Sequence, residues 1–183
     1  MQFTLAGYFP KITALPAGFE APPHVAEICS VSGCVNTNPK NWVGLWLHNG
    51  LWFFDSPAVA RTAAAGDERF EILAFRILHA RFVDGRREDW PPEPVTPEPL
   101  AEGWQRLGFD AVSRSAGPMF ECSPLSCNYM HREIQVNRHC LVDSPLEAIA
   151  MAERFSREKP EPGDYYLFEV FRLPPLAPAP HSS

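Results

Sequence analysis

Runs of aromatic and β-branched residues, separated by turn residues, predict a chain of short strands. Residues 70–83 form the longest such run, and Pro10 is expected to stop the first strand. The run at residues 51–54 has no polar alternation, which favours a strand buried on both faces. In order, the expected strands are residues 2–9, 24–28, 51–54, 70–83, 109–114, 119–122, 139–142 and 165–173.

Apolar residues at helical spacing, together with capping residues, predict the helices. Two of them follow the tripeptide Asp-Ser-Pro, because serine caps a helix well and proline suits its first turn. These helices are expected at residues 57–65, ended by Gly66, and at residues 145–158. In the second helix we expect Leu146, Ile149, Ala150 and Phe155 to pack beneath a polar face. Shorter helices are expected at residues 38–46 and 126–133.

Several landmarks occur twice in the same order. The segment Cys29–Cys34 (CSVSGC) is echoed by Cys122–Cys127 (CSPLSC), and each of these Cys loops precedes an Asp-Ser-Pro, at Asp55 and Asp143. Chance recurrence of common turn chemistry is the alternative explanation. The order favours an internal duplication. We therefore predict an α+β fold in which each half runs strand, Cys loop, helix, strand, helix, strand.

Proline-rich segments suggest the boundaries of this fold. Residues 89–99 are expected to form an extended connection between the half-repeats at residues 1–83 and 109–173. The tail at residues 174–183 has nothing to pack and is expected to be disordered. The prediction is therefore a single compact α+β domain at residues 1–173.

Composition narrows the class of protein. With 45% hydrophobic and 12% aromatic residues among 183, the chain can form a core, which excludes disorder along its whole length. The 16 Lys and Arg against 22 Asp and Glu give a net charge of −6, so direct nucleic-acid binding is not expected. No segment reads as a secretory signal or as a membrane span. An odd count of 5 Cys also favours reduced thiols, and hence a cytoplasmic protein.

The paired cysteines are the strongest candidates for chemistry. Zinc takes four soft ligands, and a twofold arrangement of the loops could bring Cys29, Cys34, Cys122 and Cys127 together, with His131 and His139 as further donors. Buried, unreactive cysteine is the competing interpretation. A third interpretation makes Cys127 a nucleophile at a helix start. His131 or His139 would then be its base, and Asn128 or Asn137 would orient that base.

Binding surfaces are suggested by aromatic and acidic residues. Trp42 and Trp46 have i, i+4 spacing on the expected helix, and tryptophan is common at protein interfaces. The mixed charges at residues 81–89 read as a solvated turn, from which Asp84, Glu88 and Asp89 could steer a basic partner.

Nucleotide, zincin and hydrolase motifs are missing from the sequence. The leading hypothesis is a small acidic protein that binds another protein as an inhibitor, immunity protein or adaptor. It would act without enzymatic activity or a cofactor, and its negative charge would suit a basic partner. The alternative is a zinc-binding or thiol-based protein that uses the two C-x4-C loops with His131 and His139. The sequence leaves the identity of the partner and the oligomeric state open.

Overall fold

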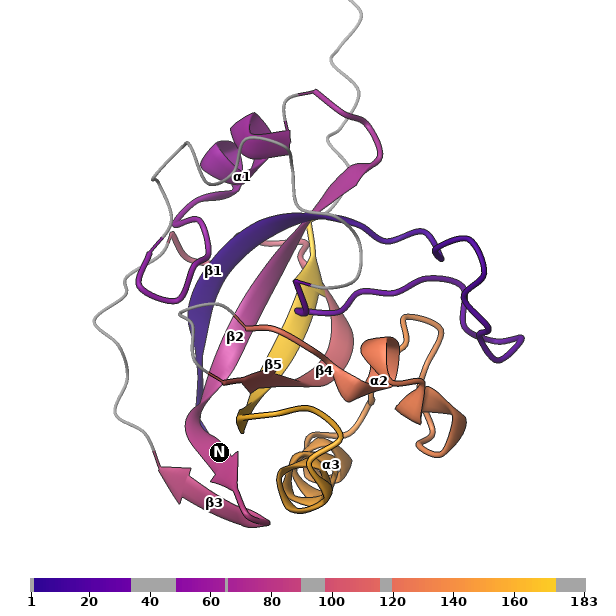
Figure 1. Cartoon of the computed structure of the whole chain (residues 1–183). Coiled ribbons are helices and arrows are strands. Elements are labelled where there is room, and N and C mark those ends of the chain that lie inside the picture. Colours follow the sequence, from indigo (N-terminus) through magenta and orange to yellow (C-terminus); the bar gives the residue numbers. More distant parts are fainter. Residues whose placement is uncertain (1, 34–48, 65, 90–97, 116–119, 174–183) are drawn as a thin grey trace, which may run out of the picture.

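An antiparallel sheet organises the chain, which the computed structural model describes at residues 2–33, 49–64, 66–89, 98–115 and 120–173 (Figure 1). The strand order is β1-β2-β5-β4, and β3 pairs with the far end of β2. The elements are β1 (Phe3–Ile12), α1 (Pro57–Ala64), β2 (Phe70–Val83), β3 (Arg86–Asp89), β4 (Gln105–Arg114), α2 (Pro124–Cys127), the 3-10 turn η2 (Met130–Arg132), α3 (Pro145–Glu158) and β5 (Asp164–Arg172). The predicted single α+β domain is therefore confirmed.

The central strands are the best predicted elements. β2 has the bounds expected from its apolar run, and β5 begins one residue earlier than predicted. The first strand differs, because β1 continues past Pro10 to Ile12. Its only neighbour in the sheet is β2, so β1 is an edge strand. Proline is tolerated in an edge strand because its missing N–H can face away from the neighbour.

The longer helices pack at opposite ends of the sheet (Figure 1). α1 contacts β1 and β2, whereas α3 lies across β2, β4 and β5. α3 has its predicted bounds, with Ser144 capping its first turn. Two residues expected on its packed face are exposed instead, Leu146 to 71% and Ala150 as well. The buried face instead contains Ala148, Met151, Ala152 and Phe155, and Leu146 points away because it lies two residues from the start of that series.

Two loops, each organised by an asparagine, run from Asn49 to Asp55 and from Asn137 to Asp143 and cover edges of the sheet. Strands were expected within them, at residues 51–54 and 139–142. Each loop makes one isolated bridge, between Tyr8 and Phe54 and between Phe109 and Val142. Neither run is a strand, because Trp52 and Cys140 have φ values of 65° and 58°. Such left-handed backbone turns the chain after two or three residues. The loops therefore occupy the unpaired edges of β1 and β4 and protect them from pairing with other chains.

The hydrogen bonds of the two loops correspond one to one. In each loop the Asn side-chain oxygen accepts two backbone N–H groups of its own loop, and the side-chain nitrogen donates to an edge strand and to the aspartate of Asp-Ser-Pro. For Asn49 the partners are Leu51 N, Phe53 N, Ala6 O and Asp55 Oδ1; for Asn137 they are His139 N, Leu141 N, Leu107 O and Asp143 Oδ1. This correspondence supports two similar halves, while duplication of the chain stays a prediction.

Other expected elements are absent or shorter. Residues 24–28 contribute only the bridge from Glu27 to Ala14, and residues 120–122 are not a strand, although residues 121 and 122 pair with Ser113 through backbone hydrogen bonds. The helix expected at residues 126–133 is replaced by α2 and η2. The expected solvated turn is partly a strand, because β3 continues from the turn at Asp84 and Gly85. The helix predicted at residues 38–46 lies outside the described residues.

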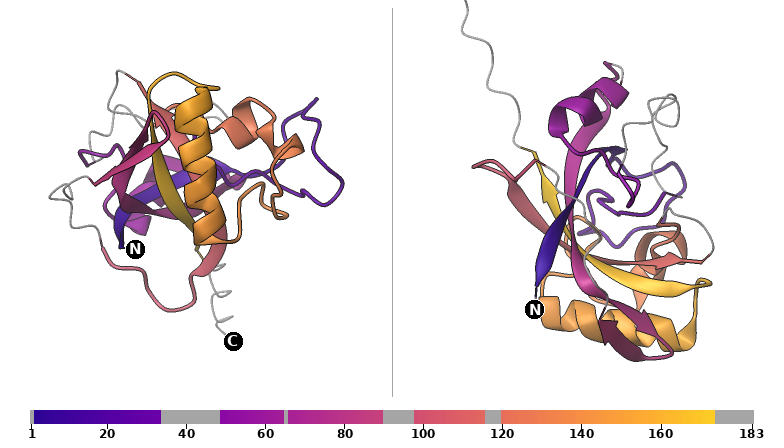
Figure 2. Two further views of the ribbon diagram at one scale, coloured as in Figure 1. Left: turned by 90° about the horizontal axis from the view of Figure 1, so that it is seen from below. Right: turned by 90° about the vertical axis from the view of Figure 1, so that its left-hand side faces the viewer.

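β5 sends side chains to both faces of the sheet, one towards α3 and one towards Asp110. Tyr165 contacts Phe155 of α3, whereas Phe168 is paired in register with Asp110, which holds both loops. These two β5 side chains point to opposite faces because they are an odd number of residues apart. Figure 2 shows α3 along one side of the twisted sheet and the irregular segments on another. α3 therefore packs on the face of Tyr165, and Asp110 lies on the face of Phe168. Leu125 of the second Cys loop packs in the same apolar cluster as α3.

Candidate functional site

The two Cys loops meet at the fully buried carboxylate of Asp110 on β4. Ser30, next to Cys29, donates to Oδ2 at 2.7 Å, and Ser123, next to Cys122, donates to Oδ1 at 2.6 Å. The backbone N–H of Val31 also donates to Oδ2. Burial raises the pKa of Asp110, although the serine hydrogen bonds oppose this effect. These contacts fasten both loops to the sheet through Asp110.

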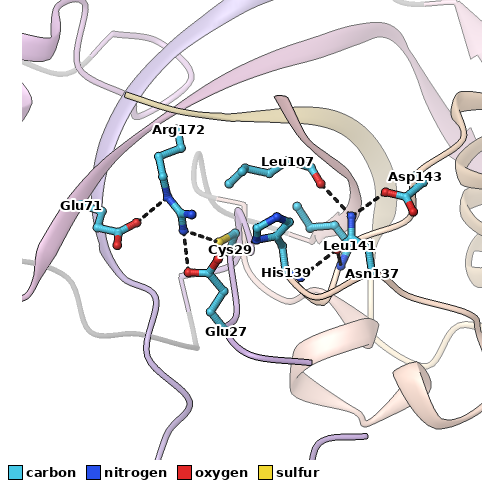
Figure 3. A network of polar contacts seen from close by, with 9 residues as sticks. All are labelled: Glu27, Cys29, Glu71, Leu107, Asn137, His139, Leu141, Asp143 and Arg172. Atoms are coloured by element: carbon cyan, nitrogen blue, oxygen red, sulfur yellow. Dashed lines mark hydrogen bonds and ion pairs between the residues drawn. The ribbon is translucent and has the colours of Figure 1, made fainter. Parts of the chain in front are cut away.

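A second polar cluster lies beside the first Cys loop, where Glu27, Cys29 and His139 converge (Figure 3). Glu27 Oε1 lies 2.6 Å from His139 Nδ1, and Arg172 donates to Glu27 Oε2 at 2.6 Å. Arg172 also contacts the Cys29 sulfur at 3.4 Å and Glu71 at 2.7 Å. The cluster thus joins a loop of the first half to the last strand and to a loop of the second half.

Backbone hydrogen bonds hold the two segments of this cluster side by side. Ala26 and Glu27 donate to the carbonyl of Arg138, and Cys29 donates to the carbonyl of His139. The backbone N–H of His139 donates at 2.8 Å to Asn137, the centre of the loop on the β4 edge. The edge loop therefore positions the imidazole, as the right of Figure 3 shows.

Burial and neighbouring charges both act on the pKa values of the cluster residues. Burial disfavours the ionised form of Glu27, but the hydrogen bonds from Arg172 and His139 outweigh burial and hold its pKa below the usual range. Burial raises the pKa of Cys29, whose exposed fraction is 0%. The thiol is therefore protonated at neutral pH and shielded from reagents, which argues against a nucleophilic role for Cys29.

The predicted cysteine sites are only partly brought together. Cys34 lies outside the described residues, so the four-cysteine site stays a prediction. Cys127 lies 3.4 Å from the hydroxyl of Ser32 in the other Cys loop, so the two loops are adjacent. Cys122 and Cys127 are partly exposed. Neither belongs to the group of Glu27, Cys29 and His139. Among the described residues, this is the one group of at least three His, Cys, Asp or Glu side chains whose ligand atoms all lie within 4.8 Å of one another.

The residues proposed to assist a Cys127 nucleophile are engaged elsewhere. His131 is buried, with Nδ1 2.6 Å from the Leu125 carbonyl and Nε2 3.1 Å from the Glu20 carbonyl. Asn128 donates to the Pro160 carbonyl. These contacts favour a structural role for His131.

The predicted partner-binding residues lie apart from the cluster. Trp42 and Trp46 fall outside the described residues. The three acidic candidates lie on or next to the β2–β3 hairpin, and each has a basic neighbour: Asp84 pairs with Lys159, Glu88 with Arg81 and Asp89 with Arg87. These exposed pairs reduce the local negative charge, and each stabilises the fold only slightly.

A groove opens where β2 begins and β5 ends, next to α1. Its volume is about 510 Å³. Its walls combine apolar residues with charged residues, and Glu71 and Arg172 are shared with the polar cluster; the lining residues are Arg61, Ala64, Gly66, Asp67, Glu68, Phe70, Glu71, Ile72, Arg172 and Leu173. The cluster therefore reaches the surface through this groove.

Sequence reasoning missed Glu27, Arg172 and Asn49, and it named Asn137 only as a residue that could orient a catalytic base. A usable signal did exist for the asparagines, because both halves contain Asn-x5-Asp-Ser-Pro, beginning at Asn49 and at Asn137. Nothing local marks Glu27 or Arg172 as partners of Cys29, since Glu27 and His139 are 112 positions apart in the chain.

Comparisons with protein-family models, with curated proteins and with solved structures gave no match to this chain. In the described part of the chain, no helix has the length and apolar character needed to cross a membrane. The functional argument therefore depends on the residues themselves.

Proposed function

We propose that this acidic protein acts without catalysis, by binding another protein, in the manner of an inhibitor, immunity protein or adaptor. The groove beside α1 carries this proposal. Phe70, Ile72 and Leu173 supply apolar surface there, and Arg61 and Glu68 supply charges. Protein interfaces commonly combine apolar and charged groups in this way.

The partner we propose is basic. The net charge of −6 would speed its approach, since long-range attraction raises association rates more than it raises affinity. Asp84, Glu88 and Asp89 would act at this stage, because they are exposed and distant from the groove. Trp42 and Trp46 remain candidate contacts from the sequence alone.

The test compares what wild-type and variant proteins retain from a lysate of the source cells. Leu173→Asp places a charge in the groove just after β5, and we expect it to lose the partner. Leu146→Asp is the matched control, because this leucine is exposed on α3 at the other end of the sheet. Equal thermal midpoints would show that both variants fold. A partner retained equally by both variants would contradict the groove as its binding site.

Salt dependence tests the charge of the recovered partner. Association should slow as salt rises, because the Debye length falls to about 8 Å near physiological ionic strength. Reversing Glu88 should reduce the association rate and leave the dissociation rate nearly unchanged. An association rate that does not respond to salt would contradict a basic partner.

The thiol-based alternative has less support than the binding proposal. Cys29 and Cys140 are buried, and burial raises the pKa of Cys140 to about 12. Among the described cysteines, a thiol enzyme would therefore have to use Cys122 or Cys127. A small-molecule turnover that depends on Cys127 would favour this alternative over protein binding.

A further inference from the structure

Three side chains that zinc commonly uses as ligands converge beside the first Cys loop. Glu27, Cys29 and His139 each place a potential ligand atom within 4.8 Å of the other two. We propose that they bind a zinc ion through a carboxylate oxygen, the thiolate sulfur and a ring nitrogen. This set differs from the four-cysteine site expected from the sequence, and it draws ligands from both halves of the chain.

The ligand types favour zinc over a harder cation. Zinc binds sulfur at about 2.3 Å and histidine nitrogen or carboxylate oxygen at about 2.0–2.2 Å, whereas calcium and magnesium prefer oxygen alone. A tetrahedral zinc ion would separate its nitrogen and oxygen ligands by roughly 3.3 Å. Glu27 Oε1 and His139 Nδ1 are now 2.6 Å apart, so they would move apart by a few tenths of an ångström. Water would take the fourth position.

Arg172 is the main objection, because a guanidinium repels a metal cation. Its contacts nevertheless leave the proposed ligand atoms available. It binds Oε2 of Glu27, the oxygen turned away from His139, and Glu71 offsets its charge at 2.7 Å. Its hydrogen bond to Cys29 would also stabilise a thiolate ligand. Such supporting contacts around ligands typically change metal affinity by about 10–100-fold.

Zinc and protons would compete for the same ligand atoms. Zinc would take the place of the Cys29 thiol proton, which passes to solvent, and His139 would bind through Nδ1 with its ring proton on Nε2. Metal affinity should accordingly fall as the pH falls.

The test loads the full-length protein with zinc or with cobalt(II) as a spectroscopic probe. We expect about one equivalent of metal and a thiolate-to-cobalt charge-transfer absorption. Cys29→Ser should remove that absorption and weaken zinc binding by at least about 100-fold, because a direct ligand matters more than the contacts that support it. Cys122→Ser is the matched control and should keep both properties.

A second variant keeps the proposal testable if the Cys29→Ser protein does not fold. Glu27→Gln keeps the size of the side chain and retains an oxygen for Arg172, and we expect it to weaken zinc binding by at least about tenfold. The thermal midpoint of wild type should rise with zinc concentration. Wild-type protein that binds no zinc would overturn the proposal, as would unchanged affinity in folded Cys29→Ser or Glu27→Gln protein. These results are independent of the partner experiment.

Discussion

Ser30 and Ser123, each next to the first cysteine of its Cys loop, donate hydrogen bonds to opposite oxygens of one buried carboxylate. Asp110 is therefore the point at which the two Cys loops meet on the sheet. The arrangement gives the repeated Cys-Ser dipeptides a structural purpose that does not involve the sulfur atoms.

Asp110→Asn should alter how stability depends on pH. Because burial raises the pKa of Asp110 in the folded state, folding favours its protonated form. Its contribution is present at low pH and is lost as the pH rises above about 4 towards the raised value. The variant should thus gain stability relative to wild type between pH 4 and pH 7 in urea unfolding. If the free energy of unfolding depended on pH in the same way for both proteins, this prediction would be contradicted.

Glu27→Gln should show the opposite pH dependence. The pKa of Glu27 is lowered in the folded state, so its contribution is present above about pH 4 and is lost as the pH falls towards the lowered value. At neutral pH we expect a loss of roughly 1.5–3 kcal/mol, the usual range for hydrogen bonds to charged groups. Glu68→Gln in the groove serves as a control and should show little change at any pH.

Asn49→Ala and Asn137→Ala should destabilise the protein by similar amounts. Each asparagine makes four hydrogen bonds with its loop, an edge strand and an aspartate. At about 1 kcal/mol for each bond, the free energy of unfolding should fall by roughly 2–4 kcal/mol. Asn128→Ala removes one exposed hydrogen bond and should cost much less. A large effect at only one of the two asparagines would contradict equivalent loops.

Gly108→Ala should destabilise the fold more than Gly50→Ala. Gly108 has φ 147°, and an added Cβ would lie 2.8 Å from both the Leu141 Cβ and the Val142 carbonyl. Strain and overlap together should cost more than about 2 kcal/mol. No described residue lies within 4 Å of a Cβ added at Gly50, so this variant should be nearly neutral in thermal unfolding. Equal losses would show that the loop can move away from β4.

Thiol labelling of the native protein should separate the cysteines into two classes. Cys29 and Cys140 are buried with raised pKa values, so they should react slowly with an alkylating reagent. Cys122 and Cys127 are partly exposed and should react faster. Peptide mapping by mass spectrometry at increasing times would measure each rate. Fast labelling of Cys29 in folded protein would contradict its burial.

The sequence by itself determined the elements whose causes are local. The apolar run of β2 and the Asp-Ser-Pro that precedes α1 and α3 predicted those elements closely, because cap and strand chemistry act over a few residues. The apolar runs at residues 51–54 and 139–142 were misread as strands. Their left-handed Trp52 and Cys140 depend on how an asparagine turns the loop onto an edge strand.

Only the tertiary structure decided which polar groups share a site. The contacts of Cys29 with Glu27, His139 and Arg172 could not be read from the sequence, and the four-cysteine site stays a prediction. Glu27 and Arg172 are 145 positions apart, and they meet because β5 pairs with β2 and so brings the end of the chain to the first Cys loop. Such contacts arise from strand order and loop packing, and neither is encoded by the spacing of residues within a short segment.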